Sequence, residues 1–99
     1  MSYYRITFDK ALKRQVDDLP GKLRQETRHR IADLARNPRP LGAIELMGYP
    51  GIYRMWLRDA RYRLVWEVID SETRVEVYYV GLKPNYGELI REKAESESD

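Results

Sequence analysis

Cationic and aromatic side chains alternate along one segment of the chain. Residues 52–58 have the composition of a β-strand, in which successive side chains point to opposite faces. Arg54, Trp56 and Arg58 therefore share one face, with about 7 Å from each to the next. Such a row suits a single-stranded nucleic acid, because the cations neutralise phosphates while the indole stacks on an unstacked base. A solvent-facing sheet surface, with arginines around a partly covered tryptophan, explains the same pattern.

Further basic and aromatic residues are expected to reach this face. Arg63 lies on the next predicted strand, residues 62–69, and a third guanidinium would concentrate positive potential there. Lys83 and Tyr86 follow the last predicted strand and are expected at the edge of the same face. An ion pair between Arg63 and Glu67 is the structural alternative, and such surface pairs contribute little to stability.

Other reactive side chains are few. The chain has no cysteine, which excludes disulfides and thiolate metal sites, and its one histidine, His29, lies between two arginines on a predicted helix. Asp17 and Asp18 are adjacent, so they point in different directions from a helix and form no carboxylate pair. The glycine-rich phosphate loops and the zinc-protease and serine-hydrolase motifs are missing. We therefore expect no metal and no small-molecule cofactor.

Charge is distributed unevenly over the 99 residues, whose net charge is +2. Residues 1–87 hold 16 basic and 11 acidic side chains, whereas residues 88–99 hold two basic and five acidic ones. We expect residues 1–94 to form one domain and residues 95–99 an acidic, disordered tail. The basic body is compatible with a phosphate-rich partner or with an acidic protein. Since no long apolar run is present, we expect a cytoplasmic protein without a membrane partner.

The elements that position these residues follow the hydrophobic periodicity. Strands are predicted at residues 3–8, 52–58, 62–69 and 74–80, with a short extra strand near 43–47. Helices are predicted between the cap residue Asp9 and Pro20, at residues 22–36 and at residues 85–94. This order, β-α-α-β-β-β-α, predicts an α+β fold with an N-terminal helical hairpin packed on an antiparallel sheet.

Three segments in the second half of the chain form a pattern: YRMWLR at residues 53–58, YRLVWEVID at 62–70 and VYYVG at 77–81. In these segments the chain resembles the RelE/ParE superfamily of type II toxins. The opening strand at residues 4–8 and the Asn-Pro at 37–38 agree with this resemblance, so it covers residues 3 to about 92. The RelE-like fold that it implies matches the predicted α+β arrangement.

The resemblance implies a toxin that a cognate antitoxin protein holds inactive. Members of the RelE type are endoribonucleases that enter the ribosome and cleave the mRNA codon in the A site without a metal, through attack of the ribose 2′-OH on the adjacent phosphate. Carried over to this sequence, the candidate catalytic residues are Arg63, Lys83, Arg54 and Tyr86. The candidate RNA-binding residues are Arg58, Trp56 and Arg61.

Two departures from the RelE pattern leave other functions open. Trp56 stands at a position that is basic in RelE-type enzymes, so one proton-transfer lysine is missing. Lys83 would serve as the acid only with a lowered pKa. The ParE branch shares the fold, lacks the cleavage residues and inhibits DNA gyrase, and a reduced basic set is typical of it as well. A degenerate member that only binds its antitoxin is the third possibility.

Overall fold

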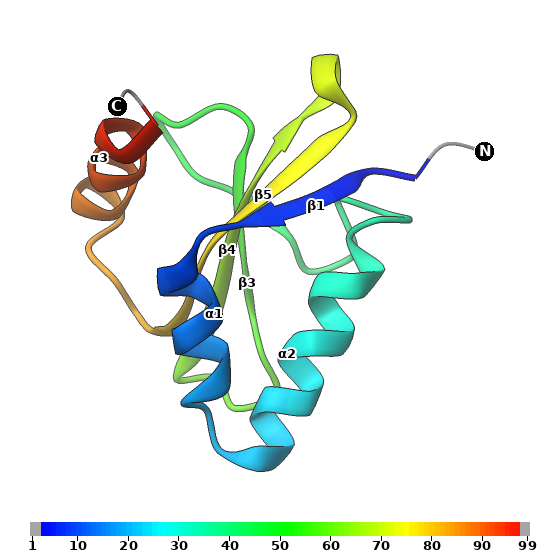
Figure 1. The fold of residues 1–99 in the computed structure, drawn as a ribbon, viewed down its shortest axis with the longest axis vertical. Coiled ribbons are helices and arrows are strands. Elements are labelled where there is room, and N and C mark those ends of the chain that lie inside the picture. The colour runs from blue at the N-terminus through cyan, green and yellow to red at the C-terminus, as the bar shows by residue number, and fades with distance from the viewer. Residues whose placement is uncertain (1–2, 98–99) are drawn as a thin grey trace.

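A computed structural model describes residues 3–97 of the chain. Three helices and a five-stranded sheet follow one another in the α+β arrangement that the sequence predicts (Figure 1). In chain order the elements are β1 (Arg5–Phe8), α1 (Lys10–Asp17), α2 (Gly21–Asp33), β2 (Ile44–Glu45), β3 (Ile52–Trp56), β4 (Tyr62–Ile69), a 3₁₀ turn at Asp70–Glu72, β5 (Arg74–Leu82) and α3 (Tyr86–Glu97).

The sheet has the strand order β1-β5-β4-β3-β2 and is mixed rather than wholly antiparallel. β2 to β5 form the expected antiparallel ladder. β1 instead lies parallel to β5, with Arg5 opposite Arg74 and Phe8 opposite Val77. The two strands adjacent in space are the first and the last in the chain, so alternation within each could not reveal their relative direction.

The two faces of the sheet bury separate apolar clusters. The α1–α2 hairpin covers one face and α3 covers the other (Figure 1). The larger cluster joins the hairpin to the sheet through residues that include Leu12, Val16, Leu23, Leu34, Leu64, Trp66, Val75 and Val77. The smaller cluster, under α3, consists of Ile52, Val65, Tyr78 and Leu89. Burial on both faces explains why β4 and β5 read as nearly continuous apolar runs in the sequence.

Local sequence signals set the helix ends. Asp9 caps α1 as predicted, since its carboxylate accepts a hydrogen bond from the Leu12 amide at 2.9 Å. α2 begins at Gly21, directly after Pro20, and ends at Asp33. The residues up to Arg36, which we expected in this helix, instead form tighter turns. Their helical geometry cannot continue because Pro38 disfavours it in the residue before.

α3 is longer than the sequence indicated. It runs to Glu97, so residues 95–97 of the expected acidic tail are helical, whereas residues 98–99 of that tail lie outside the described part of the chain. Asn85 caps its first turn by accepting a hydrogen bond from the Glu88 amide at 3.0 Å. Lys93 ties the helix to the start of α1 through Asp9, at 2.7 Å. Among residues 3–97, no helix has both the length and the apolarity needed to cross a membrane.

Candidate functional site

The alternation of β3 and β4 brings three of the predicted site residues to the sheet face that α3 partly covers, and α3 itself supplies a fourth. Arg54 and Trp56 lie two residues apart on β3, and Trp56 pairs directly with Arg63 on β4. Directly opposed residues of an antiparallel pair share a face, so Arg63 is also a diagonal neighbour of Arg54. Tyr86, the first residue of α3, hydrogen-bonds with Arg63. We call Arg54, Trp56, Arg63 and Tyr86 the arginine face.

Two contacts position the Arg63 guanidinium. Its central carbon lies 4.8 Å from the centroid of the Trp56 ring, a cation–π contact. Its Nη1 donates a hydrogen bond to the Tyr86 hydroxyl at 3.2 Å. The Trp56 side chain remains half exposed. The guanidinium is therefore oriented by aromatic groups that leave its positive charge uncompensated.

The arginine face holds buried donor atoms without acceptors. Nη1 of Arg54 and Nε of Arg63 are both buried, and neither has a hydrogen-bond partner within residues 3–97. In the same part of the chain no carboxylate lies within ion-pair distance of either guanidinium. Each unsatisfied buried donor lowers the stability of the folded protein by about 1–3 kcal/mol. These two donors therefore do not contribute to the stability of the fold. Such donors suit an anionic ligand that supplies the missing acceptors.

Glu67 does not neutralise Arg63. Its carboxylate accepts a hydrogen bond from the buried Tyr78 hydroxyl instead. Ile52 is the residue opposite Glu67 on β3, whereas Trp56 is opposite Arg63, so the two charged side chains are at different levels of the sheet. The ion pair that would have made Arg63 purely structural is therefore replaced by a tyrosine–carboxylate contact.

An irregularity in β5 shapes the surroundings of Arg63. The register shift between Val65 and Trp66 makes Tyr79 the partner of Val65 and Val77 the partner of Trp66, so Tyr78 is the extra residue. Both Tyr78 and Tyr79 then pack with the cluster under α3. Alternation along β5 cannot reveal this arrangement, because a regular strand would place them on opposite faces.

Gly81 lies opposite Arg63 and is a site feature that we did not predict. A Cβ atom at Gly81 would approach the Tyr79 hydroxyl to 2.7 Å, and that hydroxyl donates to the Leu82 carbonyl at 2.8 Å. Burial, and after it the proximity of Tyr86, raise the pKa of Tyr79, which stays protonated. The signal in the sequence was a glycine within an otherwise bulky strand, which is typical of a close approach by another group.

Among residues 3–97, none of the remaining candidate residues makes a hydrogen bond or an ion pair with the arginine face. Lys83, just beyond the end of β5, is exposed, and among the described residues its ammonium makes neither a hydrogen bond nor an ion pair. Arg58 and Arg61 are in the turn between β3 and β4, where they line a pocket with residues of α2. The expectation that Arg58 shares a face with Arg54 is wrong, because β3 ends at Trp56 and the alternation ends with it.

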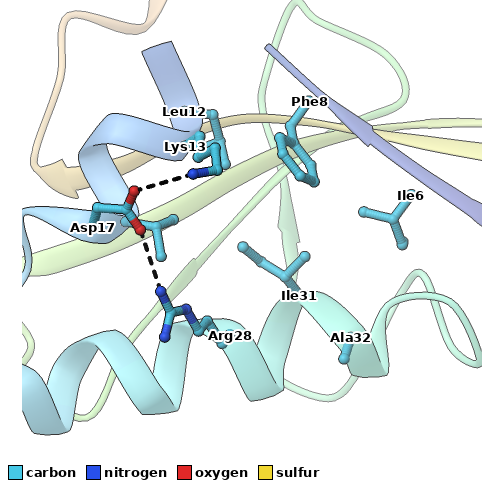
Figure 2. Close-up of a pocket in the computed structure, with 9 residues that line it drawn as sticks. Ile6, Phe8, Leu12, Lys13, Asp17, Arg28, Ile31 and Ala32 are labelled. Carbon is cyan, nitrogen blue, oxygen red and sulfur yellow. Dashed lines mark hydrogen bonds and ion pairs between the residues drawn. The ribbon is translucent and has the colours of Figure 1, made fainter. Parts of the chain in front are cut away.

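One further hollow of the molecule has a different character. A mainly apolar groove of about 330 Å³ lies between β1, α1 and α2, with Phe8 and Ile31 in its wall (Figure 2). Its charged groups are already paired, since Asp17 binds both Lys13 and Arg28 (Figure 2). Within residues 3–97 no three histidine, cysteine, aspartate or glutamate side chains gather where they could hold a metal ion.

Comparison with known proteins identifies relatives of nearly the same length. No family model matches the chain. It is 30% identical to the mRNA interferase toxin RelE of Escherichia coli K12, in an alignment that covers 92% of this chain and 97% of that protein. An arginine-to-alanine double mutant of E. coli toxin RelE in the free state superposes with a TM-score of 0.73 at 29% identity, over 97% of this chain and 98% of the other. The toxin of the intact E. coli RelBE toxin–antitoxin complex superposes with a TM-score of 0.70 at 29% identity, over 83% and 99%.

Proposed function

Because the chain belongs to the RelE family of toxins, we propose that it is the toxin of a type II toxin–antitoxin system and acts as an endoribonuclease on mRNA. The observation that carries this proposal is the arginine face, where two guanidinium groups present buried donors with no acceptor. A phosphodiester supplies the oxygens that these donors lack, and guanidinium groups bind phosphate through paired hydrogen bonds.

In the proposed reaction the ribose 2′-oxygen attacks the adjacent phosphorus while the bond from phosphorus to the 5′-oxygen breaks. The products are a 2′,3′-cyclic phosphate and a 5′-hydroxyl, so the 2′-OH loses a proton and the leaving oxygen gains one. Arg63 and Arg54 stabilise the charge on the phosphoryl oxygens, which is the largest single contribution that such a site can make. The half-exposed Trp56 ring and Tyr86 stack on bases next to the scissile bond.

The site has groups that stabilise charge but few groups that can transfer a proton. Among residues 3–97, no histidine or carboxylate hydrogen-bonds with Arg54 or Arg63. We assign Lys83 as the acid for the leaving oxygen, because its ammonium lies beyond β5 and has no intramolecular partner there. A site with charge stabilisation but no strong base depends on the orientation of its substrate, which the ribosome supplies when it holds mRNA in the A site.

The same proposal includes an antitoxin protein as partner. The E. coli relative is known in a complex of toxin and antitoxin. In this chain β1 is an edge strand, with no strand on its outer side within the described residues, and the body of the molecule is basic. An acidic, amphipathic segment would cover both features. We place the pair in the cytoplasm, where ribosomes and mRNA are found.

Primer extension on mRNA bound to purified 70S ribosomes tests the activity. We expect cuts within the codon in the A site at concentrations where E. coli RelE cuts, and the same RNA without ribosomes should stay intact. No cleavage under these conditions would refute the proposal. A supercoiling assay with purified DNA gyrase tests the ParE-type alternative. A ParE-type toxin would inhibit the gyrase and would not cleave RNA.

A further inference from the structure

A second basic surface lies on the other side of the sheet from the arginine face. It is a pocket of about 480 Å³ between α2 and the turn that joins β3 to β4. We call it the basic pocket. Four cations line it, together with two carboxylates: Lys22, Arg30, Arg58 and Arg61, and Glu26 and Asp59.

The two carboxylates of the basic pocket hold the turn in place. Glu26 accepts a hydrogen bond from the backbone amide of Arg58 at 2.8 Å, and it lies 3.9 Å from Nε of Arg30. Asp59 accepts from the backbone amide of Arg61 at 3.1 Å and from its guanidinium at 3.1 and 3.2 Å. The acidic groups are therefore used in fixing the backbone and in orienting two of the cations.

The other two cations have no intramolecular role. Within residues 3–97, neither the Arg58 guanidinium nor the Lys22 ammonium has a hydrogen bond or an ion pair. The basic pocket thus has two positive charges in excess, on side chains whose backbones belong to a helix and to a turn anchored on that helix. Cations on a rigid support, without counter-charges, are what an anionic partner needs.

We propose that the basic pocket binds RNA phosphates outside the dinucleotide that is cleaved. This inference rests on the proposed function in taking RNA as the partner. Three of the four cations are arginines, whose planar forks match phosphate oxygens. The turn that carries Arg58 directly joins Trp56 to the strand of Arg63, so a backbone leaving the arginine face at this end of the sheet reaches the basic pocket next.

Salt-dependent binding of a fluorescein-labelled 2′-O-methyl RNA hairpin of about 20 nucleotides tests this inference, because this RNA cannot be cleaved. The variant is Lys22→Gln/Arg58→Gln, which removes the two unpaired charges without breaking a contact of the fold. The matched control is Lys10→Gln/Arg14→Gln, which removes two exposed cations from α1, outside the basic pocket.

We expect the pocket variant to bind the hairpin about tenfold more weakly and to lower the slope of log Kd against log salt by about 1.5, since each phosphate contact contributes about 0.7–0.9. The control variant Lys10→Gln/Arg14→Gln should change the affinity and the salt slope by much less. Equal effects of the two variants would overturn the inference. So would an equal loss of affinity for a poly-glutamate peptide, which would mark the pocket as a site for an acidic protein.

Two further measurements separate this inference from the proposed function. Arg63→Ala should lower cleavage on the ribosome by about 100-fold or more, whereas it should lower the salt slope for the hairpin by no more than the contribution of a single phosphate contact, about 0.7–0.9, which is less than the pocket variant does. If the protein fails to cleave mRNA at all, the pocket-specific loss of hairpin binding is still measurable. Thermal unfolding of both double variants should match that of the unmodified protein, and Arg58→Lys, which keeps the charge, should restore most of the affinity.

Discussion

Arginines occur in two opposite situations in this molecule. On the arginine face, the Arg63 guanidinium lies over the Trp56 ring and donates a hydrogen bond to the Tyr86 hydroxyl, and among residues 3–97 it has no carboxylate partner. At the far end of β4, Arg39 binds both carboxylate oxygens of Asp70, at 2.7 and 3.3 Å, and donates from Nε to the Tyr53 hydroxyl at 2.8 Å. Each guanidinium has five N–H groups that can donate hydrogen bonds. Arg39 therefore has a carboxylate within the protein, whereas Arg63 has one neutral acceptor and a buried Nε without a partner among the described residues.

The structural arginine is part of a closed network. Asp70 also accepts a hydrogen bond from the Tyr4 hydroxyl at 2.6 Å. The hydrogen bond with Arg39, followed by that from Tyr4, lowers the pKa of Asp70 below its ordinary value. Arg39 also lies over the Tyr53 ring, which stacks on the buried Trp66. This network anchors the segment after α2 to the sheet, and we call it the Arg39 corner.

The comparison teaches that the partners of an arginine, rather than its position on the sheet, separate structural from functional use. A guanidinium whose charge is compensated contributes to the fold and has little left to offer a ligand. A buried guanidinium without a carboxylate lowers the stability of the fold, because its donors have lost water without gaining an acceptor. Its positive charge remains available to bind a phosphate. Substitutions at the two places should therefore separate activity from stability.

The largest effect is expected for Arg63→Ala. Loss of the phosphate-binding guanidinium should lower the cleavage rate on ribosomes by about 100-fold or more, the cost of removing one charge-stabilising donor. The melting temperature should stay the same or rise slightly, since an unsatisfied buried donor is removed. Primer extension and circular dichroism measure the two quantities. A variant that unfolds would instead place Arg63 with the structural arginines.

A smaller effect is expected for Trp56→Ala. Stacking of a base on an aromatic ring contributes about 1–3 kcal/mol, so the concentration of toxin needed for half-maximal cleavage should rise about tenfold or more. Trp56→Phe keeps a ring and should retain most of the affinity. Equal losses in the two variants would contradict stacking as the role of this residue.

Arg39→Ala should show the reverse of the behaviour of Arg63→Ala. Asp70 and the Tyr53 hydroxyl lose their shared partner, so the melting temperature should fall by a few degrees. Cleavage per folded molecule should remain within about twofold of the unmodified protein. Thermal melts measure the stability, and cleavage assays well below the melting temperature measure the activity. A variant with normal stability but no activity would contradict the distinction between the Arg39 corner and the arginine face.

The smallest effect concerns acid stability. Burial opposes ionisation of Asp9, but the hydrogen bonds from Lys93 and from the Leu12 amide more than offset it, so the pKa of Asp9 is lowered. Asp70 is shifted in the same direction. Groups with a lowered pKa in the folded state stabilise it above the ordinary value of 3.8 and lose that contribution as the pH falls further.

The free energy of unfolding should therefore be flat near neutrality and decrease as the pH falls below 3.8. Denaturant titrations between about pH 2 and pH 6 measure this dependence. Asp9→Asn and Asp70→Asn should each make it less steep. An unchanged pH profile in both variants would show that neither carboxylate contributes.

Much of the site could be predicted from alternation along single strands. Arg54, Trp56 and Arg63 share a face because β3 and β4 are joined by a short turn, which makes their pairing local. Alternation failed where a strand ended or was irregular. β3 stops before Arg58, and the extra residue in β5 turns two consecutive tyrosines to one face. Sequence patterns carry no information about either event, because both depend on the neighbouring strand.

The amino-acid sequence by itself determined the class of fold, the order of the elements and the excess of arginine in the body of the molecule. These properties follow from periodicity and composition, which act over a few residues at a time. Only the tertiary structure decided which arginines meet a carboxylate. Arg39 and Asp70 are 31 residues apart, and Lys93 and Asp9 are 84 apart. Such long-range pairs form only when the whole chain packs, and in the packed chain no carboxylate among residues 3–97 lies within ion-pair distance of Arg54 or Arg63.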